Sequence, residues 1–225
     1  MLLLGLDSSA KAASCAVYDA SEKNIVAYGG VNVKITHSET LLPLAENILK
    51  AAKLTLSDID AFAVTNGPGS FTGVRISVSA VKGMAFALDK PVYAVSALQS
   101  LAYNLQGQSC SNKIICAVMD ARRGQFYNAL FEIKGGKITR LVSDRAIGIK
   151  ELEAELAQYK KEEIIIIGDG AELIKNYTHA PIAALHQNAV SVCLAALEEI
   201  PVTAKEIMPL YLRLPQAERE RKEKS

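Results

Sequence analysis

An acidic turn that occurs twice is the feature of this 225-residue sequence best suited to chemistry. Asp7-Ser8-Ser9 follows the apolar residues 2–6, and Asp120 follows the apolar residues 114–119. Such a turn can offer hydroxyls and backbone N–H groups to a phosphate, while its carboxylate holds a hydrated cation. Two facing turns of this kind would close on a nucleotide between two halves of the chain. The alternative for each turn is an ordinary polar connection.

The second turn departs from this pattern because Arg122 and Arg123 stand where a phosphate-binding turn has small residues. We interpret this copy as a contact surface more than a phosphate clamp. Another polar turn, at residues 168–170, follows the fully apolar residues 164–167. The sequence thus predicts a vestigial nucleotide cleft formed by Asp7, Ser8, Ser9, Asp120, Gly168, Asp169 and Gly170.

A glycine-rich turn, Gly67-Pro68-Gly69-Ser70, precedes a long apolar segment that is predicted to be a helix. The N–H groups at a helix N-terminus can bind an anion. The turn is not a phosphate loop, because no Lys follows Gly73. It does not match a dinucleotide fingerprint either, because Thr72 replaces the third Gly and Ser96 stands where an acidic residue should end the next strand.

The elements that position these turns come in two similar series. In the first, apolar periodicity predicts strands at 2–6, 14–18, 25–35, 61–65 and 92–95, and helices at 40–53, 72–88 and 97–105. Ser38 or Thr40 is expected to cap the first helix, with Pro43 in its first turn. The second series has predicted strands at 114–119, 125–132, 137–142 and 164–167, and helices that begin after residue 170 and at 150–159 and 189–199.

The spacing of the two aspartates predicts a duplication. Asp120 lies 113 positions after Asp7, and each residue ends an apolar strand that a short turn joins to a second strand. We therefore predict an α/β fold of two similar halves with mixed sheets flanked by helices. Their predicted bounds are residues 1–106 and 107–217, followed by a charged, flexible tail at 218–225.

Composition narrows the class of protein. The 25 Lys and Arg residues balance 24 Asp and Glu residues, so a net charge of +1 predicts no strong electrostatic attraction to nucleic acid. The apolar N-terminal run ends at Asp7 and is too short for a signal peptide or a membrane span, so we predict a cytoplasmic protein without membrane contact. The cysteines lack C-x-x-C spacing and are predicted to be buried, reduced thiols: Cys15, Cys110, Cys116 and Cys193.

The sequence predicts neither a catalytic constellation nor a metal site. The three histidines, at positions 37, 179 and 186, share no helical spacing. Two helices instead carry more apolar residues than one face requires, and we interpret them as a partner surface. The alternative is that the chain's own sheet covers them. The residues predicted for this surface are Leu41, Leu42, Ala45, Leu49, Ser79, Gly83 and Ala87.

Five segments together resemble the TsaB (YeaZ) family across nearly the whole chain. They are Asp7-Ser8-Ser9, residues 37–43, residues 66–75 with the sequence Asn-Gly-Pro-Gly-Ser-Phe-Thr-Gly-Val-Arg, residues 119–124, and residues 209–213. The resemblance implies a duplicated fold similar to actin, Hsp70 and the sugar kinases, which is a ribonuclease H-like arrangement. It also implies a role in modifying tRNA.

In that family the protein is a non-catalytic partner of the paralogue TsaD, which transfers a threonylcarbamoyl group to N6 of the adenosine next to the tRNA anticodon. The ATPase TsaE completes the complex. The paralogue holds a metal with an H-x-x-x-H pair and an Asp, and the matching positions here are His37, Leu41 and Gln187. The resemblance therefore implies a degenerate copy with no metal, no catalytic residues and no required cofactor. The predicted cleft leaves weak nucleotide binding open.

The main hypothesis is thus a scaffold that binds TsaD and, with it, TsaE, that forms a homodimer when isolated, and that meets tRNA indirectly through the complex. The first alternative is an ATP-dependent small-molecule kinase of the same fold that uses Asp7 and Asp120. The second is direct tRNA binding by Arg122, Arg123 and the basic residues within 219–224.

Overall fold

The computed structural model describes residues 1–32, 36–108, 112–174, 177–179 and 186–213. The first sheet has the order β3-β2-β1-β4-β5. Its antiparallel hairpins join β1 to β2 and β2 to β3, whereas β4 and β5 are parallel to β1. The bounds are β1 Leu2–Asp7, β2 Ala13–Asp19, β3 Asn24–Val31, β4 Ala61–Gly67 and β5 Val92–Ser96.

The second sheet repeats this arrangement, with the order β10-β9-β6-β7-β8. Two antiparallel hairpins again precede parallel strands on the other side of the first strand. The bounds are β6 Lys113–Asp120, β7 Gln125–Lys134, β8 Lys137–Gly148, β9 Ile164–Ile167 and β10 Thr178–His179. Because β6 occupies the place of β1, the prediction of a duplicated α/β fold with mixed sheets is confirmed.

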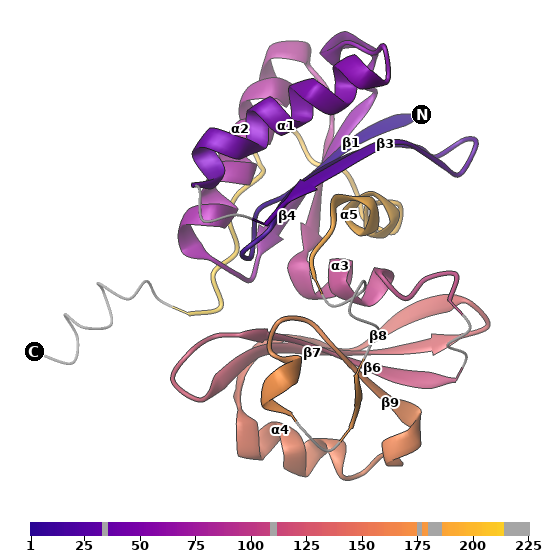
Figure 1. Cartoon of the computed structure of the whole chain (residues 1–225), viewed down its shortest axis with the longest axis vertical. Helices are drawn as coiled ribbons and strands as arrows, with labels where there is room; N and C mark the ends of the chain where they lie inside the picture. Colours follow the sequence, from indigo (N-terminus) through magenta and orange to yellow (C-terminus); the bar gives the residue numbers. More distant parts are fainter. Residues whose placement is uncertain (33–35, 109–111, 175–176, 180–185, 214–225) are drawn as a thin grey trace, which may run out of the picture.

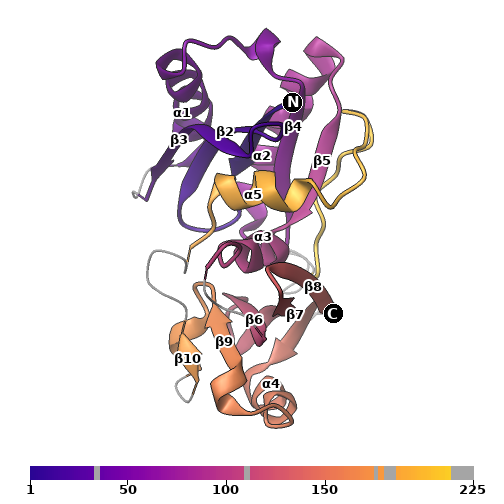
Figure 2. The ribbon, with the colours of Figure 1, turned by 90° about the vertical axis from the view of Figure 1, so that its right-hand side faces the viewer.

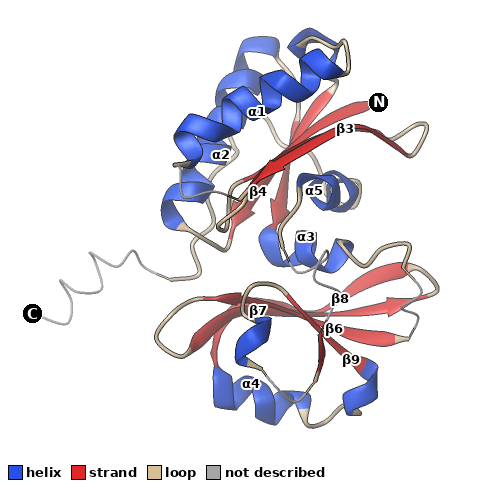
Figure 3. Ribbon diagram, in the orientation of Figure 1, coloured by secondary structure: helices blue, strands red, loops and turns tan. Residues whose placement is uncertain are grey.

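Helices separate and cover the two sheets in layers (Figures 1 and 3). Helices α1 (His37–Ala51) and α2 (Phe71–Leu88) pack on one face of the first sheet, while α5 (Ala189–Ala196) lies across its other face (Figure 2). Helix α3 (Ala97–Tyr103) contacts α5 on one side and the second sheet on the other. Helix α4 (Ile149–Leu156) covers the far face of the second sheet. The two halves therefore share a helical layer.

Helix α5 packs against the half to which the sequence did not assign it. Residues 107–217 were predicted as the C-terminal half, yet Ala189 and Cys193 of α5 contact Leu3 and Ala16 of the first sheet. The backbone N–H of Ala189 also donates to the Ser14 hydroxyl at 3.0 Å. The apolar pattern of α5 predicts burial, but it carries no information about which sheet provides the contact. The chain thus returns to its first sheet near its end.

Three local predictions are wrong for identifiable reasons. Helix α1 begins at His37 with Thr36 as its N-cap, so neither Ser38 nor Thr40 caps it, and Pro43 lies beyond its first turn. After β9, the three-residue 3₁₀ turn Ala171–Leu173 replaces the predicted helix, because Ile174 is already extended. Two further 3₁₀ turns span Leu56–Asp58 and Lys161–Glu163.

Helix α2 is long and apolar enough to cross a membrane by length and composition alone. Its Val74, Val78 and Val81 side chains are buried against the first sheet, where they belong to the same core as Phe62 and Val64 of β4. Ser70 caps the helix by accepting a hydrogen bond from the Gly73 N–H. One face of α2 therefore packs into the core of the first half, and 33% of the helix is buried.

Three cysteines are free and buried, at positions 15, 116 and 193, as the sequence predicts. Burial raises the pKa of each of these thiols to about 12. Cys110, residues 33–35 of the third predicted strand, and the charged tail at 218–225 lie outside the described residues.

Candidate functional site

The turn after β1 lies beneath the glycine-rich turn that precedes α2. The Ser8 hydroxyl donates to the Gly73 carbonyl at 2.8 Å, and the Ser70 N–H donates to the Ser9 carbonyl at 2.7 Å. A Cβ at Gly69 or at Gly73 would lie under 3.0 Å from the backbone oxygen of this acidic turn. Glycine is therefore required at both positions by the close approach of two backbones, and the contact encloses the acidic turn.

Enclosure changes the chemistry of Asp7. Asp7, Ser8 and Ser9 are all 0% exposed. Burial raises the pKa of Asp7, while hydrogen bonding from Ser9 opposes the increase in part. The Ser9 N–H already donates to Asp7 Oδ1 at 2.7 Å. A carboxyl group in this setting disfavours its charged form, so Asp7 is poorly suited to hold a hydrated cation.

A cleft of about 550 Å³ opens beside this enclosed turn, between the two sheets' strand ends. Of the predicted nucleotide-cleft residues, Ser9, Asp120 and Asp169 line it, whereas Asp7, Ser8, Gly168 and Gly170 do not. Gly168 and Gly170 instead allow close packing against β6 and Phe126. The structure thus brings only part of the predicted set together.

Asp120 and Asp169 are adjacent in the cleft. The Asp120 N–H donates to Asp169 Oδ1 at 3.2 Å, and the Arg122 N–H donates to Asp120 Oδ1 at 2.7 Å. Burial and the nearby Asp120 charge raise the pKa of Asp169. Both carboxyl groups therefore organise the backbone of the turn after β6. That turn holds Arg122 and Arg123 with positive φ angles of 63° and 56°, and both residues are exposed.

The C-terminal segment 208–213 crosses the cleft and connects its two sides. The Leu210 N–H donates to the Asn66 carbonyl at 2.7 Å, and Arg213 donates to the Ala121 carbonyl at 2.6 Å. The Tyr211 ring stacks on Phe71 with centroids 4.6 Å apart. Residues 209–213 are marked in the sequence only by the family resemblance, because apolar and aromatic residues near a C-terminus do not indicate which surface they will cover.

The residues at the implied metal positions do not fit a metal. His37 Nε2 lies 2.8 Å from the Ala10 carbonyl oxygen, so this nitrogen carries the proton and donates. Leu41 is 1% exposed in the core between α1 and the first sheet, and Gln187 supplies an amide where a carboxylate is needed. No group of three or more His, Cys, Asp or Glu side chains with metal-binding geometry occurs among the described residues.

The predicted partner surface is divided by the structure. Leu41, Ala45 and Leu49 belong to the core and cannot contact another molecule, because the first sheet covers them. Leu42 is 48% exposed. On α2 the predicted residues Ser79, Gly83 and Ala87 are all exposed. Most of the apolar stripe of α1 therefore lies in the core. The part of the predicted surface that faces outward consists of the three small residues of α2 and Leu42 of α1.

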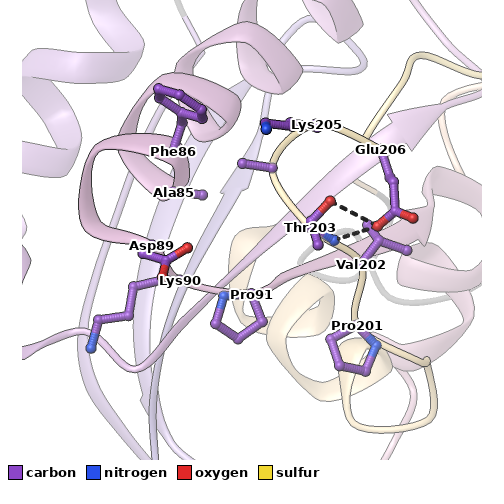
Figure 4. Close-up of a pocket in the computed structure, with 11 residues that line it drawn as sticks. Ala85, Phe86, Asp89, Lys90, Pro91, Pro201, Val202, Thr203, Lys205 and Glu206 are labelled. Atoms are coloured by element: carbon purple, nitrogen blue, oxygen red, sulfur yellow. Dashed lines mark hydrogen bonds between the residues drawn. The ribbon is translucent and has the colours of Figure 1, made fainter.

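A second hollow, of about 490 Å³, lies at the opposite end of α2 (Figure 4). Phe86, which is 65% exposed, stands on one side of it, and Pro91 and Pro201 lie on the other. Glu206 accepts hydrogen bonds from the N–H and hydroxyl of Thr203, which fixes the loop at its edge. Its charged lining residues are of both signs, so it offers no preferred site for a cation or an anion.

Comparisons with known proteins cover almost the whole chain. The family model described as TsaD, tRNA N6-adenosine threonylcarbamoyltransferase, matches residues 15–219. The chain is 30% identical over 227 residues to the tRNA threonylcarbamoyladenosine biosynthesis protein TsaB of Bacillus subtilis (strain 168), with 97% of this chain and 96% of the relative covered. The protein of the same name from Escherichia coli (strain K12) is 29% identical over 175 residues, which cover 76% and 72% of the two chains.

A solved structure agrees with these sequence matches. YeaZ from Pseudomonas aeruginosa has a TM-score of 0.79 and 27% identity, with 94% of this chain and 99% of that chain covered. The agreement with this structure confirms the predicted α/β fold of two similar halves with mixed sheets flanked by helices. The chain belongs to the TsaB (YeaZ) family of tRNA threonylcarbamoyladenosine biosynthesis proteins.

Proposed function

We propose that this chain is a non-catalytic subunit that binds the threonylcarbamoyltransferase TsaD through the outer faces of α1 and α2. One observation carries the proposal: three exposed small residues, Ser79, Gly83 and Ala87, recur every fourth position on α2. A Cβ built on Gly83 meets no atom within 4 Å. Small residues at this spacing let another helix approach closely, and Leu42 adds apolar area beside them.

The absence of catalysis by this chain is part of the same proposal. It is supported by the position of Leu41 in the core and by the hydrogen bond that His37 makes to the Ala10 carbonyl. The enclosed Asp7-Ser8-Ser9 turn offers no open position for a triphosphate with its cation. We therefore propose that the subunit requires no cofactor and that it binds free nucleotide weakly.

The remaining parts of the assembly follow from this surface. We propose that the ATPase TsaE joins after the heterodimer has formed, that tRNA is held chiefly by the complex, and that the complex works in the cytoplasm, where its tRNA substrate is found. In the absence of TsaD, the same exposed face of α2 would pair with a second copy of the chain, because a self-complementary helical face suits a two-fold dimer.

Mass measurement in solution tests the proposal. The full chain and TsaD from the same organism should form one species with the summed mass, and the isolated chain should form a dimer. Gly83→Gln places a long side chain on the exposed stripe and should weaken both associations. Ala154→Gln, at an exposed position on α4, is the matched control and should leave both intact. Persistent separate particles with the unsubstituted chains would overturn the proposal.

A further inference from the structure

The cleft between the halves offers more basic groups than the sequence suggests. Lys11, Arg122 and Arg213 line it, against the two carboxyl groups of Asp120 and Asp169. Each carboxyl group already accepts a backbone N–H, and burial raises the pKa of Asp169. The lining is therefore net positive near neutral pH, although the whole chain is almost neutral.

The start of α2 adds to this positive character. Ser70, Phe71 and Thr72 line the cleft, and the first turn of the helix has no acidic residue. The Ser70 hydroxyl accepts the N–H of Gly73, but the N–H groups of the first helical residues have no acceptor within the helix. A phosphate oxygen is the kind of acceptor that these groups and the helix dipole favour.

Aromatic rings line the same space. Phe71, Tyr127 and Tyr211 all contribute to it, and Tyr211 is 38% exposed. Arg75 lies 3.8 Å above the Phe71 ring and donates to the Tyr211 hydroxyl at 2.7 Å, which fixes both rings. Aromatic rings among basic groups are the combination with which proteins bind single-stranded nucleic acid, because bases stack on the rings while cations contact phosphates.

We propose that this cleft binds a nucleotide unit of single-stranded RNA, with its phosphate near Lys11, Arg122 and the start of α2, and its base against Tyr127 or Tyr211. The proposal rests on the proposed function, since the RNA is the tRNA substrate of the complex. A polymer is favoured over free ATP because the acidic turn that would hold a triphosphate's cation is enclosed. Arg123, exposed beside Arg122, extends the basic surface beyond the cleft toward a neighbouring phosphate.

Fluorescence anisotropy with a labelled single-stranded RNA of about ten nucleotides tests this inference on the full chain, alone and bound to TsaD. Binding should weaken with salt, and Arg122→Gln should reduce the slope of log K against log salt by about 0.7. Tyr127→Leu should weaken binding roughly tenfold by removing a stacking surface. Lys23→Gln is the matched control, because Lys23 is also an exposed, positive-φ cation in a turn, at the other end of the first sheet.

The outcomes separate this inference from the proposed function. Equal losses from Arg122→Gln and Lys23→Gln, or no RNA binding by the chain in either state, would overturn the RNA site. The RNA site would also be overturned if ATP displaced the labelled RNA at a lower concentration than the same RNA without the label does. The mass of the complex with TsaD is measured on the same Arg122→Gln sample. Loss of RNA binding with an intact heterodimer supports the RNA site, whereas failure of the unsubstituted chains to associate refutes the proposed function alone.

Discussion

Two glycines of helix α2 should respond in opposite ways to the same substitution. In Gly83→Ala the new methyl group meets no atom within 4 Å, so the variant should gain the ordinary helical preference of alanine, about 0.8–1 kcal/mol. In Gly73→Ala the methyl group would lie under 3.0 Å from the Ser8 carbonyl oxygen. Either the acidic turn or the start of α2 must then move.

The size of the second effect follows from the contacts that such a movement breaks. The bonds from the Ser8 hydroxyl to the Gly73 carbonyl, at 2.8 Å, and from the Ser70 N–H to the Ser9 carbonyl, at 2.7 Å, join the two segments. Each buried group left without a partner costs about 1–3 kcal/mol. After the helical gain is subtracted, Gly73→Ala should lose about 3 kcal/mol, which lowers Tm by roughly 6–12 °C in a chain of this length.

Urea unfolding followed by far-ultraviolet circular dichroism measures both effects, and the method suits a chain with no Trp. The unsubstituted chain, Gly73→Ala and Gly83→Ala are compared at one pH and temperature. The reasoning is refuted if Gly73→Ala is as stable as the unsubstituted chain, or if Gly83→Ala loses as much stability as Gly73→Ala.

Three further predictions use the buried groups and the C-terminal segment. Because burial raises the pKa of Asp7, its contribution to stability is present below the unfolded-state pKa and is lost as pH rises through the folded-state pKa. The free energy of unfolding of Asp7→Asn relative to the unsubstituted chain should therefore increase with pH between these values, and a difference that is constant with pH would contradict the enclosure of Asp7. A Cys110→Ser variant should resist a thiol reagent until it is unfolded, because burial raises the pKa of the other three thiols to about 12; rapid labelling of the native variant would show that this burial is wrong. Arg213→Gln should speed hydrogen exchange at the Leu210 N–H by releasing the segment from the Ala121 carbonyl, whereas Lys205→Gln, at an exposed position outside the cleft, should not.

The repeated hairpins were predictable because their signal is local. Apolar runs that end in Asp7 and Asp120, each followed by a second strand, fix the antiparallel pairs. The 113-position offset between them then predicts that the arrangement is repeated. The apolar segment that follows the glycine-rich turn likewise predicts helix α2. These features depend on neighbouring residues, so one sequence is enough to find them.

The site was less predictable because it depends on which surfaces meet. Leu41 and Leu42 are adjacent and equally apolar, yet one is 1% and the other 48% exposed. Asp7 looks like an open, charged group in the sequence, and only the approach of Gly73 from 66 positions away encloses it. The basic and aromatic residues of the cleft come from four separate segments. Contacts between residues that lie far apart in the chain leave no local pattern in the sequence.

The position of α5 sets an order of events during synthesis on the ribosome. The first sheet is complete at Ser96, but the helix that covers its second face begins at Ala189. At typical translation speeds of about 5–20 residues per second, that apolar face waits roughly 5–20 s for its cover. The growing chain must keep this face from other nascent chains during that interval. The first half to be translated is thus among the last parts of the molecule to be completed.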